Sequence, residues 1–402
     1  MLSLLACLLL GLSVSADAAK LPSRAQFINQ RSFNVLNATL PPAEFNASSL
    51  FIPPGTTAAS LSERPFHVYD KEFLSIIGSN PSLTLIAASA KDPLFHEAVT
   101  WSRETDEMFF VQNAGAKDAG TGLDKSSIIQ KISLAQAVAV SNLTNATGLV
   151  DVVTVHSSQS IPNPNGATNF RGKLIFTAEG QGDDIAPGLF VMDPKEPYNT
   201  KPILNNFFGR QFNSLNDVNI HPTSKDVYFT DTIYGYVQDF RPAPGIQDQV
   251  YRFNPDTGAV TVVADGFVHP NGLSFSPDGK YLYITDTGIS YGFYGTNLTE
   301  PASIYRFDVA EDGTLDNRKT FAFISAGNPD GIHCDTNGNV YAACEDGVHV
   351  YNPSGKLIGK IWLGTLSANF NFAGKGRMVI AAETELYYAT LAAEGSYVES
   401  EM

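Results

Sequence analysis

The feature that most constrains this chain is a long repeat in which a polar residue precedes a strand, a turn and a second strand. Asn216 and Asn271 lie 55 residues apart, and Asn271 and Asp330 lie 59 residues apart. Alternating apolar residues follow each of them, over residues 217–231, 272–286 and 331–344. A repeat of about 40 to 60 residues built from short strands is typical of β-propellers, in which each repeat is one four-stranded blade. We therefore predict an all-β propeller.

The same pattern extends to less regular parts of the chain, at residues 96–114, 172–194 and 370–391. Counting these units predicts about six blades. We also expect a strand pair at residues 66–74 and 83–89. The N-terminal strands should close the ring against the last unit, because propellers avoid a free sheet edge in this way.

Composition agrees with one large domain and excludes one class of partner. The chain has 402 residues, of which 43% are apolar and 11% aromatic, enough for a sizeable core. Its formal net charge is −15, so it lacks the basic surface that attracts nucleic acid. We expect no nucleic-acid partner.

The N-terminal residues 1–19 are typical of a signal peptide. An apolar core of about a dozen residues, too short to span a bilayer, ends in small residues. A retained anchor is the alternative. We expect a secreted, extracellular protein without membrane contact after cleavage. Residues 20–64 should form an arm on the outside of a propeller domain at 65–402. Five N-glycosylation sequons fit a secreted glycoprotein, at Asn37, Asn46, Asn142, Asn145 and Asn297.

Two cysteines remain after removal of Cys7 with the signal. Cys334 and Cys344 flank a hairpin whose turn would pair Cys334 with a residue near Asn339 or Val340. In an oxidising compartment the two could form a disulfide. The sequence therefore leaves two alternatives: a disulfide between Cys334 and Cys344, or two buried thiols.

The position of the polar residues favours a metal site on the propeller axis. Glu97, Asn216, Asn271 and Asp330 each stand just before a predicted strand. Inner strands begin near the axis, so one residue per blade can point at a common ligand. A single Asp or Asn in such a place more often caps a turn, and only the joint spacing favours ligands. Carboxylate and amide oxygens suit a hard cation such as Ca²⁺, whereas zinc would require a His or Cys cluster.

Several motifs together resemble one known superfamily. They are HEAVTW at residues 96–101, NDVNIHP at 216–222, PNGLSFSPDGKYLY at 270–283 and PDG at 329–331. In this order they are similar to the gluconolactonase and regucalcin (SMP-30) superfamily, in particular its secreted fungal lactonohydrolases, over about residues 65–391. The resemblance implies a six-bladed propeller with a divalent cation, commonly calcium, on its axis. It also implies hydrolysis of lactones, with relatives that cleave phosphotriester-type esters.

The resemblance also implies roles for individual residues. Glu97, Asn216, Asn271 and Asp330 would be the metal ligands. Asp330 would also be the catalytic group, which either activates a water molecule or attacks the lactone carbonyl directly.

Weaker candidates surround this set. Asp217 could support Asn216, and His96 and His269 could shuttle protons. Glu179 and Asp183 lie in a loop that could face the pocket, but we expect them to be solvated. Aromatic residues near the ligands, such as Tyr234, could line the pocket mouth, but we expect them to pack in the core.

Function is predicted as hydrolysis of a lactone of the aldonolactone type or a similar cyclic ester, with a small-molecule lactone as partner. Two alternatives remain: a calcium-dependent phosphotriester or ester hydrolase, and a non-catalytic, calcium-stabilised binding module. A serine hydrolase is disfavoured, because an all-β repeat offers no strand-turn-helix elbow for the nucleophile. The segment at residues 177–183 matches no subgroup, so the physiological lactone stays open, as does the oligomeric state.

Overall fold

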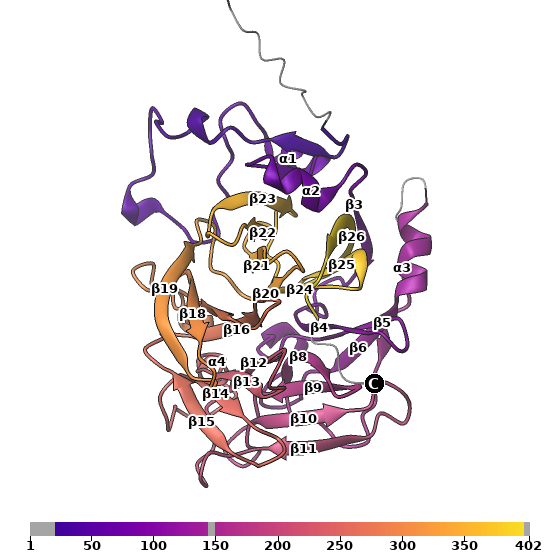
Figure 1. Ribbon diagram of the computed structural model, residues 1–402, viewed down its shortest axis with the longest axis vertical. Helices are drawn as coiled ribbons and strands as arrows, with labels where there is room; N and C mark the ends of the chain where they lie inside the picture. Colours follow the sequence, from indigo (N-terminus) through magenta and orange to yellow (C-terminus); the bar gives the residue numbers. More distant parts are fainter. Residues whose placement is uncertain (1–20, 144–148, 398–402) are drawn as a thin grey trace, which may run out of the picture.

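The computed structural model describes residues 21–143 and 149–397 and shows a six-bladed β-propeller (Figure 1). Each blade is an antiparallel sheet whose first strand is innermost. The first three blades contain β4 (Glu97–Ser102), β5 (Glu107–Val111), β6 (Ile129–Ser133) and β7 (Val153–Thr154); β8 (Pro164–Phe170), β9 (Lys173–Ala178), β10 (Gly188–Met192) and β11 (Thr200–Leu204); and β12 (Leu215–Ile220), β13 (Val227–Asp231), β14 (Gln249–Phe253) and β15 (Val260–Ala264).

The remaining three blades follow the same order and complete the predicted fold class. They contain β16 (Pro270–Phe275), β17 (Tyr281–Asp286), β18 (Ser303–Val309) and β19 (Leu315–Phe323); β20 (Ile332–Cys334), β21 (Val340–Cys344), β22 (Gly347–Tyr351) and β23 (Leu357–Trp362); and β24 (Asn369–Phe372), β25 (Lys375–Ala382), β26 (Glu385–Glu394) and β3 (Ser82–Ala88).

Helices are short and peripheral. The longest in the described part of the chain is α3 (Leu134–Ser141), between β6 and β7. The others are α1 (Ala58–Glu63), α2 (Glu72–Ile77) and α4 (Tyr234–Val237), with 3₁₀ turns η1 (Gln30–Ser32), η2 (Pro42–Glu44), η3 (Lys117–Ala119) and η4 (Gly292–Tyr294). Across residues 21–143 and 149–397, none of these helices has the length and apolar character needed to cross a membrane.

Ring closure follows the prediction, but the expected N-terminal strand pair is wrong. β3 pairs with β26, with Leu83 opposite Ala389, and so completes the sixth blade. β2 (Phe66–Val68) instead pairs with β23 of the fifth blade, with His67 opposite Lys360. The residues between them form α2, whose Phe73 lies where a Cβ on Gly359 would be, 2.2 Å away. β2 and β3 are therefore the outer strands of two different blades, the fifth and the sixth, and α2 connects them.

The arm begins on the outer edge of the fifth blade. β1 (Ala25–Phe27) pairs in parallel with β2. Ile28, Leu61 and Trp362 form a small buried cluster beneath it. The predicted signal peptide, residues 1–19, and the sequon at Asn145 lie outside the described residues.

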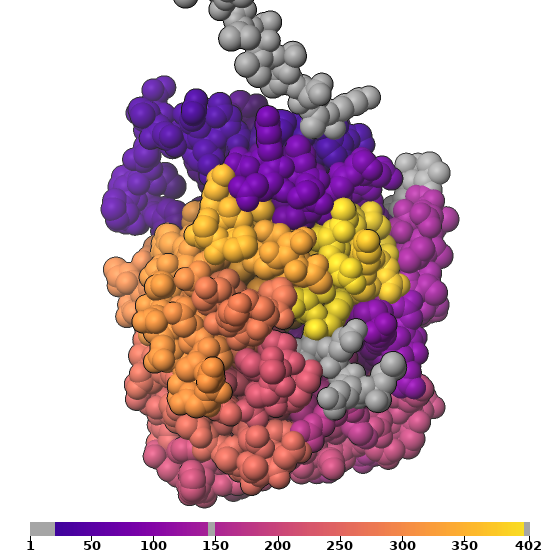
Figure 2. Space-filling view, viewed as in Figure 1, coloured from indigo at the N-terminus to yellow at the C-terminus, as the bar shows by residue number. Residues whose placement is uncertain are grey.

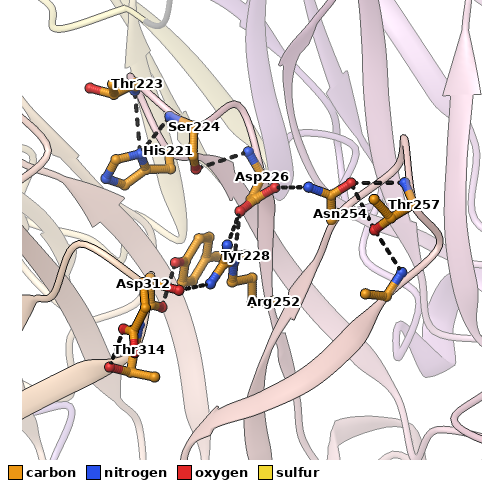
Figure 3. Close-up of polar contacts among 12 residues, drawn as sticks. His221, Thr223, Ser224, Asp226, Tyr228, Arg252, Asn254, Thr257, Asp312 and Thr314 are labelled. Carbon is orange, nitrogen blue, oxygen red and sulfur yellow. Dashed lines mark hydrogen bonds and ion pairs between the residues drawn. The ribbon is translucent and has the colours of Figure 1, made fainter.

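The third and fourth blades are joined by a polar network at the ends of the strands away from Asn216 (Figure 3). Arg252 Nε donates to Asp226 Oδ2 at 2.6 Å, and its Nη1 donates to the backbone oxygen of Asp312 on the β18–β19 turn. Tyr228 Oη donates to the Gly313 oxygen at 2.7 Å. One charged group therefore connects two strands of one blade to the hairpin of the next.

The two cysteines are free thiols. Cys334 pairs in register with Val340, as predicted, and Cys344 pairs with Gly347. Both are buried, and burial raises the pKa of Cys334 to about 12. Of the two open alternatives, the structure supports buried thiols.

Candidate functional site

A pocket of about 330 Å³ opens at the end of the propeller where the inner strands begin. It brings together residues that lie far apart in the sequence. Five of the seven predicted site residues line it: His96, Glu97, Asn216, Asn271 and Asp330. Asp217 and His269 do not.

Each blade places one oxygen-bearing side chain at the start of its innermost strand. We call this set the axial ring: Glu97, Asn165, Asn216, Asn271, Asp330 and Asn369. Asn165 and Asn369 were not predicted. Asn165 could have been predicted from the sequence, because Pro164-Asn165-Gly166 repeats the motif Pro270-Asn271-Gly272. The segment around Asn369 has no such motif.

The glycine after the ring residue allows neighbouring blades to approach closely. A Cβ added to Gly272 would lie 2.5 Å from the Asp330 backbone oxygen, and one on Gly331 would lie 2.7 Å from Asn369 Nδ2. Real Cβ atoms essentially never come so near. The Pro-Asn-Gly and Pro-Asp-Gly motifs therefore reflect the packing of the ring as well as its chemistry.

Threonines of the second strands fix the backbone of the axial ring. Thr177 Oγ1 donates to the Asn216 oxygen at 2.7 Å. Thr230 makes the same bond to Asn271 at 2.8 Å, and Thr285 to Asp330 at 2.9 Å. Each threonine reaches the ring residue of the following blade, so the ring is held between blades.

Two carboxylates of the ring lie next to each other. Burial raises the pKa of both Glu97 and Asp330, and the charge of Asp330 raises the pKa of Glu97 further. Asn369 Nδ2 donates to Glu97 Oε2 at 2.5 Å, which offsets only part of this repulsion. Such a pair requires a bound cation or a retained proton to be stable.

The unpaired atoms of the ring fit a hard cation. Asn216 Oδ1, Asp330 Oδ1 and Asn369 Oδ1 are buried and have no hydrogen-bond partner. Buried acceptors are normally satisfied, and Asn216 and Asp330 line the same pocket, so their two unpaired oxygens call for a ligand there. Across the described residues, no three His, Cys, Asp or Glu side chains form a metal-binding group. The donors here are mixed carboxylates and amides, the set that Ca²⁺ accepts.

The two candidates outside the pocket have contacts elsewhere. Asp217 accepts hydrogen bonds from the backbone nitrogens of Val218, at 2.8 Å, and Leu273, at 3.1 Å, and so connects the third and fourth blades. Burial raises its pKa to about 7. His269 packs between Tyr234 and Tyr291, with ring centroids 5.6 and 4.7 Å away, and burial lowers its pKa to about 4.

His96 lines the pocket and contacts a carboxylate that sequence reasoning missed. Its Nδ1 lies 2.7 Å from Glu383 Oε1. Burial alone would lower the pKa of His96, but the Glu383 charge outweighs it and the pKa is raised. Glu383 occupies the turn between β25 and β26 with φ of 59°, and its backbone pairs with Phe95. The two residues are 287 positions apart, so no local pattern could connect them.

The expectation that Glu179 is solvated is wrong. Its side chain is buried, lines the pocket and accepts a hydrogen bond from Ser214 Oγ at 2.9 Å. Burial raises its pKa to about 7, although Ser214 and the charge of His96 act in the opposite direction. The Glu179 nitrogen, directly after β9, donates to the oxygen of Asn163, directly before β8, at 2.9 Å. Tyr234, expected in the core, also lines the pocket, whereas Asp183 does not.

Residues 288–292 read Gly-Ile-Ser-Tyr-Gly, a nucleophile-elbow pattern that the sequence reasoning overlooked. Ser290 lines the pocket, but it lies in a loop between β17 and the three-residue turn η4. A nucleophile elbow requires a sharp strand-to-helix turn. The structure therefore gives no support to a serine nucleophile here.

The fold and ring geometry define a family, and comparison with known proteins identifies it. Residues 95–384 match the family model described as SMP-30/Gluconolactonase/LRE-like region, so the chain belongs to this family. Lactonohydrolase oryL of Aspergillus oryzae is 30% identical over 347 residues, which cover 81% of this chain and 73% of oryL. Lactonohydrolase oryH of the same organism is 26% identical, covering 77% of this chain and 76% of its own. Both relatives are named as hydrolases of cyclic esters.

Solved structures agree on the fold. A gluconolactonase from Xanthomonas campestris superimposes with a TM-score of 0.62 at 21% identity, covering 81% of this chain and 94% of its own. Regucalcin from Agrobacterium tumefaciens, described as a calcium-binding protein, gives 0.53 at 17% identity, covering 78% and 97%. At these identities the likeness shows the propeller only.

Proposed function

We propose that this protein is a metal-dependent lactonase that hydrolyses a lactone to its hydroxy acid. The observation that carries the proposal is the axial ring, in which Asn216 and Asp330 have unpaired buried oxygens and line a pocket large enough for a small cyclic ester. The lactonohydrolase relatives support the reaction class. The shared family supports a divalent cation, for which we propose Ca²⁺.

Four ring residues would hold the cation: Glu97, Asn216, Asn271 and Asp330. Asn369 would then act beside them, by holding Glu97 in place through its 2.5 Å hydrogen bond. When bound, the cation would supply a Lewis acid that polarises the lactone carbonyl and stabilises negative charge on its oxygen.

Asp330 is the proposed catalytic residue. It is half-buried at the pocket, and its backbone is fixed by the bond from Thr285. Its carboxylate would either take a proton from the attacking water or attack the carbonyl carbon itself. In the first route Asp330 takes a proton from water as the water oxygen bonds to the carbonyl carbon, and returns it to the ring oxygen when the ring C–O bond breaks. In the second route an Asp330 oxygen bonds to the carbonyl carbon, the ring C–O bond breaks and the ring oxygen takes a proton from water; the resulting hydroxide then cleaves the acyl-enzyme and restores the carboxylate.

The pocket lining favours a hydroxylated lactone over one with a fatty chain. Amide and carboxylate groups predominate, and few lining residues are apolar. Lining side chains that can bond to hydroxyl groups include Asn113, Asn165, Glu179, Gln238, Asn328 and Glu345. Hydroxyl groups would replace the water that these groups otherwise bind, whereas an alkyl chain would leave them unpaired.

The test is hydrolysis of aldonolactones, pantolactone and aromatic lactones, followed by pH-stat with and without rigorous chelation. We expect turnover that chelation abolishes and calcium restores. The matched control is Asp183→Asn, which removes a nearby carboxylate outside the pocket and should leave the rate unchanged. Full activity after chelation would contradict the metal requirement. Calcium binding without turnover of any lactone would support a binding module, and faster phosphotriester cleavage would support an esterase of that kind.

We also propose that the protein is secreted and N-glycosylated, on the basis of residues 1–19 and the sequons. Expression in a eukaryotic secretory host tests this. The mature N-terminus, read by mass spectrometry of the medium, should begin near residue 17 or 20. A full-length chain retained in the cells would contradict it.

A further inference from the structure

The substrate pocket has one wall that does not come from the propeller. Of the residues that line it, Asn46, Ala47 and Ser48 belong to the arm. All the others lie between His96 and Glu383, inside the segment 95–384 that matches the family. This chain therefore adds to a family pocket a wall that the family segment does not contain.

The arm is anchored on both sides of this wall. Before it, β1 pairs with β2, and Ile28 belongs to the cluster with Leu61 and Trp362. After it, Thr57 and Ser60 form a capping box at the start of α1. The rings of Phe33 and Phe51 meet edge to face, 5.1 Å apart. Residues 34–50, which we call the arm loop, therefore start and end at this contact between Phe33 and Phe51.

The arm loop is shaped by its own hydrogen bonds. Asn46 Oδ1 accepts from Ser48 N at 3.1 Å and from Ser48 Oγ at 3.0 Å, and the Asn46 oxygen accepts from Ser49 N at 2.9 Å. Throughout residues 29–56, hydrogen bonds join only residues three apart or fewer. Residues 46–48 therefore line the pocket without a hydrogen bond to the propeller.

Its place in the pocket follows from where the arm lies. The axial ring lies at the innermost strands of the blades, whereas the arm (indigo in Figure 2) lies at one edge of the molecule, outside the blades. An element outside the propeller can line only the open side of the pocket. Ala47 is half-buried while Asn46 and Ser48 are exposed, so Ala47 is the wall residue packed most closely against the protein.

We propose that residues 46–48 determine specificity by limiting the size of the substituent that a lactone can carry. This inference rests on the proposed lactonase function. A lactone whose carbonyl sits at the ring must direct its substituents towards the mouth, where the arm loop stands. Small lactones with short polar substituents fit beneath the loop. Lactones with a second sugar or an aromatic group contact residues 46–48.

The kinetic test adds bulk at the wall. Ala47→Trp is compared with Val35→Trp, in the same arm loop but 87% exposed and away from the pocket. The substrates are a monosaccharide aldonolactone and a disaccharide aldonolactone. We expect Ala47→Trp to lower kcat/KM for the disaccharide lactone about tenfold more than for the monosaccharide lactone, a typical discrimination by a pocket wall. An unchanged ratio, or an equal change in Val35→Trp, would overturn the proposal. Because residues 46–48 are also a sequon, all variants are made in a host without N-glycosylation.

A second measurement tests the geometry without any substrate. Ala47→Cys combined with Asn328→Cys places two thiols on the same pocket, and a short bis-maleimide should join them. Val35→Cys with Asn328→Cys is the control and should not be joined. The native Cys334 and Cys344 are buried and do not compete. Absence of the cross-link would overturn the inference even if lactones are hydrolysed. A cross-link in a protein that hydrolyses no lactone would instead show that the proposed function has failed, and the specificity role with it.

Discussion

A buried charge pair behind the pocket gives the clearest prediction about stability. Asp346 lies in the turn between β21 and β22, next to Glu345 of the pocket lining. Its Oδ2 lies 2.7 Å from Lys360 Nζ, and its Oδ1 lies 2.5 Å from His349 Nε2. The side chains of Asp346 and Lys360 are only 2% and 9% exposed. Asp346→Asn keeps the shape and removes the charge.

The expected loss is large because Lys360 would remain buried without a carboxylate. Removing one partner of a buried ion pair costs about 3 to 5 kcal/mol. Unfolding entropy of about 2.1 cal/mol/K per residue gives roughly 0.8 kcal/mol/K for 402 residues. The expected decrease in Tm is therefore about 4 to 6 °C.

Differential scanning calorimetry at pH 7 measures this, with Asp256→Asn as the matched control. Asp256 pairs with Arg171 at the surface, where the two side chains are 67% and 48% exposed, so its loss should hardly change Tm. Burial would raise the pKa of Asp346, but His349 and Lys360 together lower it. This stabilisation is present above the unfolded pKa of about 4 and is lost at lower pH, so the two proteins should converge in acid. Equal Tm changes in both variants, or no convergence, would refute the reasoning.

Three further predictions follow from other buried groups. Burial raises the pKa of Glu179 from 4.5 to about 7, so the wild type should lose stability as pH rises across that interval. With a chelator present, Glu179→Gln should have a higher Tm than the wild type at pH 8 and a similar Tm at pH 5. A lower Tm of the variant at pH 8 would contradict this. Cys334 and Cys344 are buried thiols, so a thiol reagent should label them only after denaturation, and rapid native labelling would count against it. Asn369→Ala should weaken calcium binding in calorimetry, because Glu97 loses its donor, whereas Asn371→Ala on the same strand should not; equal affinities would remove Asn369 from the site.

Much of the fold could be predicted because the alternation of apolar and polar residues along each strand is a local pattern. Two properties repeat in each blade: apolar alternation and a polar residue before the inner strand. The register at Cys334 followed from the turn alone. The pairing of residues 66–68 could not be read in this way, because two blades offered equivalent edges. In the structure residues 66–68 pair with β23, and Phe73 of α2 packs against Gly359 of that same strand.

The site was predictable where a motif marks it and hidden where the contact is long-range. Asn216 and Asn271 stand in regular repeats, and Asn165 could have been found from its Pro-Asn-Gly motif. Glu383 meets His96 through a turn at the other end of the chain. The arm loop has no strand or helix periodicity, and its sequons at Asn37 and Asn46 carry no information about packing, so its approach to the pocket is visible only in three dimensions.

The most direct test of the central claim is the rate of lactone hydrolysis by Asp330→Asn across a range of calcium concentrations. The account predicts that its rate stays about 10² to 10⁴-fold below wild type even at saturating calcium, since a catalytic group has been lost. Asn216→Ala, which removes only a neutral ligand, should recover partly as calcium is added. An Asp330→Asn enzyme restored to the normal rate by calcium would leave Asp330 as a ligand only. A normal rate at trace calcium would contradict its place in the site.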